Sequence, residues 1–178
     1  MSRLCEQVAT AAHGRGGTFV VGFESRYAIA MASPHESVYD TYISPLAQRN
    51  ASREMQETWS PRHRFTVWRR IWLAVAEAQN EAGLPVNREQ IEAIRAHVNI
   101  TDEGIKRAFQ HETNLRHDVM AHVHSLGDEA PQAKPILHLG MTSQDVVCNA
   151  DLVLIKESLQ LIEAKIARAI DALGTFAE

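Results

Sequence analysis

The sequence is poor in several residue types and patterns, and each shortage excludes a class of protein. Its 178 residues include two cysteines, Cys5 and Cys148, which form neither a CxxC pair nor a spacing typical of metal ligands. Such sparse cysteine is typical of a reducing cytoplasm, where we expect the protein. No segment approaches the roughly 18 to 20 continuous apolar residues of a transmembrane helix. Glycines and acidic residues interrupt any secretory signal in the first 30 positions, so we expect no membrane partner.

A basic excess is also missing. Eighteen Lys and Arg stand against 22 Asp and Glu, for a net charge of -4, so no uniform positive field exists to hold a nucleic acid. The sequence has no P-loop and no G-x-S-x-G motif, which leaves a GTPase, a kinase or a serine hydrolase unsupported. What remains is 45% hydrophobic and 22% charged residues, the balance of a soluble globular domain.

Helix signals dominate the middle of the chain. Ser60 and Pro61 are typical of an N-cap and a first helical position, and apolar residues then recur at steps of three and four until Gly83. Asn87 and Gln90 have the spacing of a capping box for a second, shorter helix. Thr101, Asp102 and Glu103 are typical of the start of a third helical stretch, which we expect to break near residues 115–117 and to end at Gly127. Because no strand signal appears, the predicted fold class is all-α.

The last segment predicts one long helix from Gln144 to Glu178. Its apolar residues follow one another at alternating steps of four and three, which is a heptad pattern. At 1.5 Å per residue the helix would run about 50 Å, longer than a compact domain of this size houses. We therefore expect it to be the first long helix of a truncated multi-helix bundle, or to be covered by partner chains. The residues of this heptad seam are Cys148, Leu152, Ile155, Leu159, Ile162, Ile166, Ala169, Leu173 and Phe176.

Three domains follow from these patterns. Residues 1–30 show no helical or strand period and contain a Gly-Arg-Gly-Gly stretch, so we interpret them as a disordered or mis-started extension. Residues 31–143 form an N-terminal helical domain, and residues 144–178 begin the central bundle.

Two clusters of polar residues could carry chemistry. Arg116 and His117 place a cation beside an imidazole that titrates near neutral pH, a pair suited to an anionic substrate and to proton transfer. Thr142 or Ser143 can cap the long helix, whose free N–H groups suit a carboxylate or a phosphate. Each cluster also has an ordinary interpretation, as a polar helix end and as an N-cap complemented by Asp145. The histidines at 111, 117, 122 and 124 lack the spacing of zinc ligands, so we predict no metal site and expect a structural hydrogen bond from Asp118 to His122.

These clusters also carry a family likeness. The runs RHDVMAHVH at 116–124, HLGMTS at 138–143 and NADL at 149–152, together with SPLAQR at 44–49, closely resemble the N-terminal part of the adenylosuccinate lyase family, in the fumarase/aspartase superfamily. The likeness covers about residues 39–178. It implies an all-α lyase without cofactor or metal that eliminates fumarate from adenylosuccinate, giving AMP, and from the succinylated aminoimidazole carboxamide ribotide of purine biosynthesis. It also implies a homotetramer whose active site gathers residues from three subunits, and thus a homo-oligomer built through the long helix.

The resemblance assigns roles to particular residues. Arg49 would contact the phosphate end of the substrate, and Asn50 follows it where the family usually has Tyr. His117 would bind substrate and stabilise charge, with a direct part in proton transfer left open. Arg116, His117 and Asp118 would line the pocket, and Thr142 and Ser143 would bind the succinyl carboxylates.

Two family motifs have no match before Glu178. They are the Thr-His-x-Gln-Pro-Ala segment, which resembles the source of the general acid, and the Ser-rich loop with Met-Pro-x-Lys-x-Asn, which supplies the base. We therefore expect the chain alone to be an incomplete and inactive part of a lyase. Two alternatives stay open: another lyase of the superfamily, such as argininosuccinate lyase, and a non-catalytic helical interaction protein derived from a truncated lyase, which pairs through residues 152–176.

Overall fold

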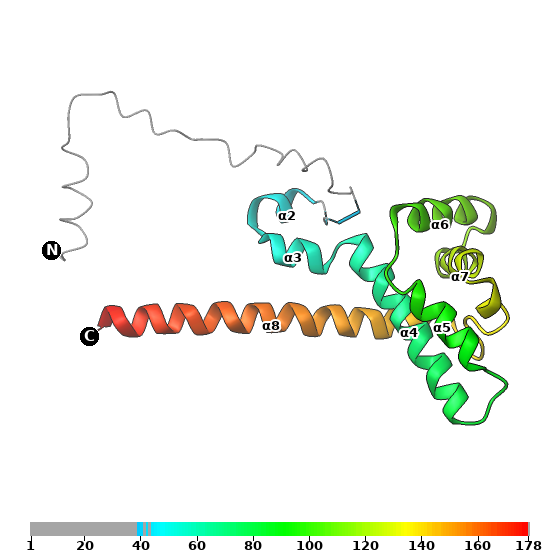
Figure 1. Ribbon diagram of the computed structural model, residues 1–178. Helices are drawn as coiled ribbons and strands as arrows, with labels where there is room; N and C mark the ends of the chain where they lie inside the picture. Colours follow the sequence, from blue (N-terminus) through cyan, green and yellow to red (C-terminus); the bar gives the residue numbers. More distant parts are fainter. Residues whose placement is uncertain (1–38, 41, 43, 178) are drawn as a thin grey trace. The chain divides into compact units, whose positions relative to one another are not determined.

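The computed structural model of the chain describes residues 39–40, 42 and 44–177, so the predicted extension at residues 1–30 lies outside the described residues. Within the described part every regular element is helical, which confirms the all-α prediction (Figure 1). None of the helices there combines the length and apolar character needed to cross a bilayer. The elements are α2 (Pro45–Asn50), α3 (Arg53–Thr58), α4 (Pro61–Glu81), α5 (Arg88–Ala96), α6 (Asp102–Leu115), α7 (Asp118–Glu129), the 3-10 turn η1 (Pro131–Ala133) and α8 (Ser143–Ala177).

The helices begin where the capping residues predict. Ser60 accepts a hydrogen bond from the His63 N–H at 3.2 Å, which satisfies one of the free donors at the start of α4. Both bonds of the predicted capping box form before α5, between Asn87 and Gln90, at 2.9 and 3.0 Å. Thr101 caps α6 in the same way, with its hydroxyl 3.1 Å from the Gly104 nitrogen.

The third helical stretch breaks as predicted but ends later than predicted. The break lies at Arg116, which adopts a left-handed φ of 50° between α6 and α7. The prediction that Gly127 ends the stretch is wrong, because α7 continues to Glu129. Gly127 is instead buried against Lys134, where an added Cβ would lie 3.2 Å from Cγ of that side chain. The missing side chain serves close packing here, and not the end of a helix.

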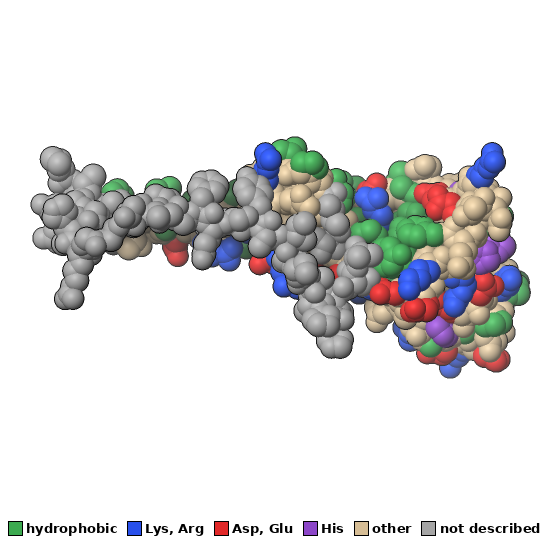
Figure 2. Space-filling view, turned by 90° about the horizontal axis from the view of Figure 1, so that it is seen from above, with side chains coloured by type: hydrophobic (Ala, Val, Ile, Leu, Met, Phe, Trp, Pro, Cys, Tyr) green, Lys and Arg blue, Asp and Glu red, His purple; other side chains and the backbone are tan. Residues whose placement is uncertain are grey.

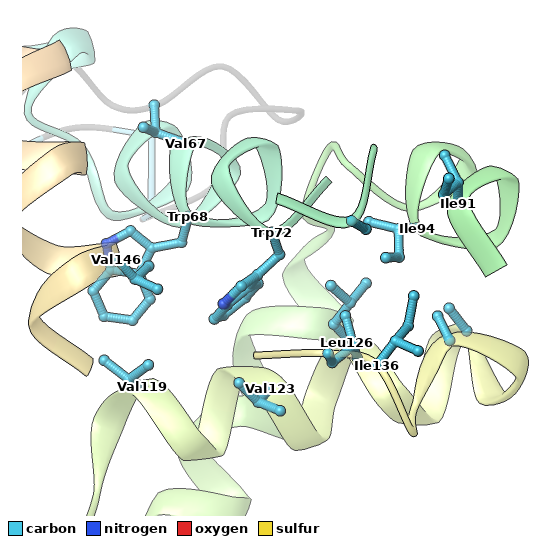
Figure 3. Packing of buried hydrophobic residues seen from close by; sticks show 14 of the residues in the cluster. Val67, Trp68, Trp72, Ile91, Ile94, Val119, Val123, Leu126, Ile136 and Val146 are labelled. Carbon is cyan, nitrogen blue, oxygen red and sulfur yellow. The ribbon is translucent and has the colours of Figure 1, made fainter. Parts of the chain in front are cut away.

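Two tryptophans of α4 form the centre of the core. Trp68 and Trp72 are 4% and 2% exposed, and Figure 3 shows their rings between α4 and the apolar residues of α7 and α8. Val119 of α7 and Val146 of α8 lie next to the Trp68 ring, so the core joins the start of α7 to the start of α8. Truncating either tryptophan would cost about 3–5 kcal/mol.

Helix α8 buries a different row of residues from its heptad seam. The buried row consists of Val146, Ala150, Leu154 and Ser158, and Trp59 donates to the Ser158 hydroxyl at 2.9 Å. The seam faces away from the described helices: exposure reaches 65% at Leu152 and 71% at Phe176, and the last two turns have no buried residue. The residues that the structure describes therefore cover only the first half of α8, and only on one side.

A buried ion network joins α4 to α6 and α7. Arg69 is 1% exposed, and its Nη1 lies 2.6 Å from a Glu129 carboxylate oxygen and 2.6 Å from the His97 carbonyl. Arg107 of α6 binds the other oxygen of Glu129 at 3.0 Å. Elsewhere the surface is mixed, with acidic and basic side chains side by side on the face shown in Figure 2.

Candidate substrate-binding site

His117 occupies the N-cap of α7, and this position fixes its ring. Its Nδ1 lies 3.4 Å from the Met120 nitrogen and accepts that backbone N–H. Because Nδ1 is an acceptor, the neutral ring carries its proton on Nε2. The side chain is 44% exposed, so a ligand can reach the ring.

The structure brings His117 to the start of α8. His117 Nε2 lies 3.2 Å from the Ser143 hydroxyl oxygen, so the imidazole N–H donates to Ser143. The contact joins two segments that the sequence singled out separately. Because the Ser143 oxygen accepts from the imidazole, its hydroxyl hydrogen is left to donate to a carboxylate or phosphate oxygen.

The residues on either side of His117 shape the same turn. Arg116 has a left-handed backbone, which costs an ordinary residue about 1–2 kcal/mol, and its side chain is exposed. The Asp118 carboxylate accepts the Val119 N–H at 2.7 Å, in the first turn of α7. The predicted hydrogen bond from Asp118 to His122 does not form, and the Asp118 carboxylate accepts the Val119 N–H in its place.

The start of α8 already holds an acidic side chain. The Asp145 carboxylate accepts the Thr142 N–H at 2.7 Å, so it complements the helix dipole as the ordinary interpretation predicts. Thr142 is exposed and Ser143 is half-buried. An arriving carboxylate would therefore contact the hydroxyls and His117 more readily than the Thr142 N–H.

His138 is a member of this cluster for which sequence reasoning proposed no role. Its backbone is left-handed, with φ of 63°, and its Nδ1 accepts the Trp72 Nε1–H at 3.2 Å. Burial lowers the pKa of His138; the nearby Asp145 carboxylate opposes this shift and His117 adds to it. The ring is therefore neutral near pH 7 and, with Nδ1 accepting, carries its proton on Nε2. In the sequence, His138 is notable only because it precedes Leu139 and Gly140 in a turn. That position does not predict its hydrogen bond to Trp72, which lies 66 positions away.

Of the other histidines of the first cluster, His111 and His124 lie close together, with ring centroids 5.4 Å apart, whereas His122 lies in the core. His122 is buried between Phe65 and Trp68, with ring centroids 3.9 and 5.3 Å away. His111 pairs with Asp128 at 2.8 Å. In the part of the chain that the structure describes, no group of three or more His, Cys, Asp or Glu side chains is arranged to hold a metal ion.

Two hollows flank α4 and share part of their walls. The Asn50 hollow, of about 830 Å³, is lined by Asn50 at the end of α2. The Asp118 hollow, of about 200 Å³, is lined by Asp118. Arg64 and Phe65 line both. Arg49 lies beside Asn50 on the exposed last turn of α2, so the predicted phosphate contact and the predicted substrate pocket lie on two sides of Arg64.

Comparison with known proteins bears on this arrangement. No protein-family model matches the sequence. The adenylosuccinate lyase of Saccharomyces cerevisiae is 48% identical over 140 residues, which are 78% of this chain and 29% of that protein. The chain is a relative of the adenylosuccinate lyases. Those of Schistosoma mansoni and Schizosaccharomyces pombe are each 40% identical, over 136 and 137 residues, or 76% of this chain and 28% of each protein.

The adenylosuccinate lyases are larger than this chain, which spans less than a third of the length of these curated relatives. The similarity reaches beyond eukaryotes, because the Methanocaldococcus jannaschii adenylosuccinate lyase is 31% identical over 137 residues. These comparisons do not favour the alternatives, a different lyase of the superfamily or a non-catalytic interaction protein.

Proposed function

We propose that this chain carries part of the substrate site of an adenylosuccinate lyase, an enzyme that releases fumarate from adenylosuccinate and from the succinylated aminoimidazole carboxamide ribotide. The observation that carries the proposal is the 3.2 Å contact between His117 and Ser143, because it joins the two segments with the family likeness into one polar site. Arg116 and Asp118 lie beside it, and Thr142 precedes Ser143.

The chemistry of the reaction fits such a site. A base removes a proton from the carbon next to a carboxylate, the bond from the neighbouring carbon to nitrogen breaks, and an acid protonates the leaving nitrogen. Negative charge develops on the carboxylate during the first step, so donors aimed at its oxygens lower the barrier. Ser143 and Thr142 supply hydroxyl donors, and the Nε2–H of His117 donates to the Ser143 hydroxyl and so orients its hydrogen toward a ligand. The base and the acid of the reaction are not among the residues assigned to this chain.

The surroundings of the site suggest where and how the protein works. The exposed heptad seam of α8 favours burial against further helices, and we propose that copies of the protein form an oligomer through it. Cys148 is an exposed free thiol, which agrees with the reducing environment of the cytoplasm. We further propose that the 178-residue chain releases no fumarate by itself, because it contains neither family motif that would supply the acid and the base.

A chimera tests the proposed function. The matched 140 residues of the Saccharomyces cerevisiae adenylosuccinate lyase are replaced by those of this chain, and fumarate release from adenylosuccinate is measured. We expect an active chimera in which His117→Ala or Ser143→Ala lowers kcat/KM by about a hundredfold. Lys106→Ala, on the exposed face of α6, is the control and should leave kcat/KM unchanged. A folded chimera that releases no fumarate would refute the proposal.

A further inference from the structure

The Asn50 hollow has the size and lining of a site for a small aromatic ligand. Its volume of about 830 Å³ lies within the range of roughly 300–1,000 Å³ that is usual for such sites. Tyr42, Trp59 and Phe65 supply aromatic surface, and Asn50 supplies an amide. Of the described residues that line the hollow, Arg64 is the one with a formal charge.

Arg64 is held in place but incompletely paired. Its guanidinium carbon lies 6.0 Å from the centre of the Trp59 ring, within cation–π range. Its Nη2 is 3.7 Å from the nearer Asp151 carboxylate oxygen, which is too long for a hydrogen bond. Among the described residues, its buried Nε has no hydrogen-bond partner. The side chain is still 40% exposed, so its outer N–H groups remain open to a ligand.

Charge decides from which side an anion reaches Arg64. On one side the Asp118 hollow is acidic, since Glu112, Asp118 and Asp151 all line it and would repel a phosphate. On the other side the Asn50 hollow has no acidic residue among its described lining residues. An anion is therefore favoured only in the Asn50 hollow, where the guanidinium can bind two of its oxygens at once.

We propose that Arg64 is a substrate-binding residue that holds the phosphate group of a nucleoside monophosphate whose aromatic part lies in the Asn50 hollow. The proposal rests on the proposed function, which supplies a nucleotide, and it adds a residue that the family likeness did not assign. The ion pair with Asp151 is loose enough for the guanidinium to take a phosphate as its main partner.

The test is an NMR titration of the 178-residue chain with AMP and, separately, with adenosine, which lacks the phosphate. We expect AMP to shift the Nε–Hε resonance of Arg64, and Arg64→Met to weaken AMP binding by at least about tenfold while adenosine binding stays the same. Arg64→Lys keeps the charge and should recover part of the AMP affinity. The matched control is Arg70→Met, because Arg70 is exposed on the same helix and lines a different hollow, with His63 and Glu157.

Each other outcome overturns the inference, and the yeast chimera separates it from the proposed function. If AMP leaves the Arg64 resonance unshifted while the chimera releases fumarate, the inference fails and the proposed function stands. If AMP leaves that resonance unshifted and the folded chimera is inactive, both fail. Equal weakening of AMP and adenosine by Arg64→Met would mean that the side chain supports the hollow and does not bind phosphate.

Discussion

His117 Nε2 and the Ser143 hydroxyl lie 3.2 Å apart although 26 positions separate them in the sequence. Each residue stands at the start of a helix, His117 before α7 and Ser143 as the first residue of α8. Helix starts present backbone N–H groups and the positive end of the helix dipole, so two of them meeting at one point favour an anionic ligand. The core explains why they meet, since Trp68 packs against Val119 of α7 and Val146 of α8 just behind them.

Stability should depend on pH through His122. Burial lowers the pKa of His122 from 6.5 to about 3; the Arg69 guanidinium adds to the shift and Asp118 opposes it. Between those pH values the unfolded chain binds a proton that the folded chain does not, so the free energy of unfolding falls as the pH falls. His122 contributes a slope of up to about 1.4 kcal/mol per pH unit and nothing further above pH 6.5.

The measurement is urea unfolding between pH 4 and pH 7, in the wild type and in His122→Phe. Phenylalanine retains a ring between Phe65 and Trp68 but cannot take up a proton, so the pH slope of this variant should be smaller. His138, whose pKa is also lowered by burial, leaves a residual slope of the same sign in both proteins. Identical pH slopes in the two proteins would show that His122 is not the source of the pH dependence.

Gly104 should not tolerate a side chain. A Cβ added there would lie 2.6 Å from a Glu129 carboxylate oxygen and 3.1 Å from Arg69 Nη2. Gly104→Ala must therefore push the buried ion pair apart, and we expect a loss of about 1–3 kcal/mol in the free energy of unfolding. Gly174 in α8 has nothing within 4 Å of such a Cβ, so Gly174→Ala should be neutral or stabilise by up to about 1 kcal/mol. Equal effects of the two substitutions in urea unfolding would exclude close packing as the reason for Gly104.

The buried pair of Arg69 and Glu129 should contribute far more to stability than a pair on the surface. Glu129→Gln leaves the Arg69 guanidinium, 1% exposed, without a counter-charge, which typically costs about 3–5 kcal/mol. Arg53 and Glu57 form a comparison pair at 2.8 Å with both side chains more than half exposed, so Glu57→Gln should cost less than about 1 kcal/mol. Thermal unfolding of both variants measures the difference, and similar melting temperatures would contradict it.

Local sequence signals predicted the helices because their causes are local. Ser60, Asn87 with Gln90, and Thr101 form their capping bonds within three residues, so the sequence contains both partners at a fixed spacing. The end predicted at Gly127 was wrong for the opposite reason. Gly127 packs against the side chain of Lys134, and this contact forms only because the chain turns back after α7.

The site was predictable in part. The family likeness pointed to His117 and Ser143, and the structure places them in contact. The roles of these two residues remain predictions, as do those of Arg49, Asn50, Arg116, Asp118 and Thr142. Two features depend on tertiary packing and no spacing in the sequence reveals them: the hydrogen bond from Trp72 to His138 across 66 positions, and the place of Arg64 between two hollows. Tertiary packing also decides which side of α8 is buried. The helix has two apolar rows, the heptad seam and the row of Val146, Ala150 and Leu154, and periodicity alone does not show which of them packs against the other helices.

The central claim, that His117 and Ser143 act in one substrate site, is tested most directly by a double-mutant cycle in the yeast chimera. The kcat/KM for adenylosuccinate is measured for the parent chimera, His117→Ala, Ser143→Ala and the double variant. Two groups that bind the same part of the substrate give non-additive losses, so the double variant should lose clearly less than the product of the two single losses. Losses that multiply, or single variants as active as the parent, would contradict the account.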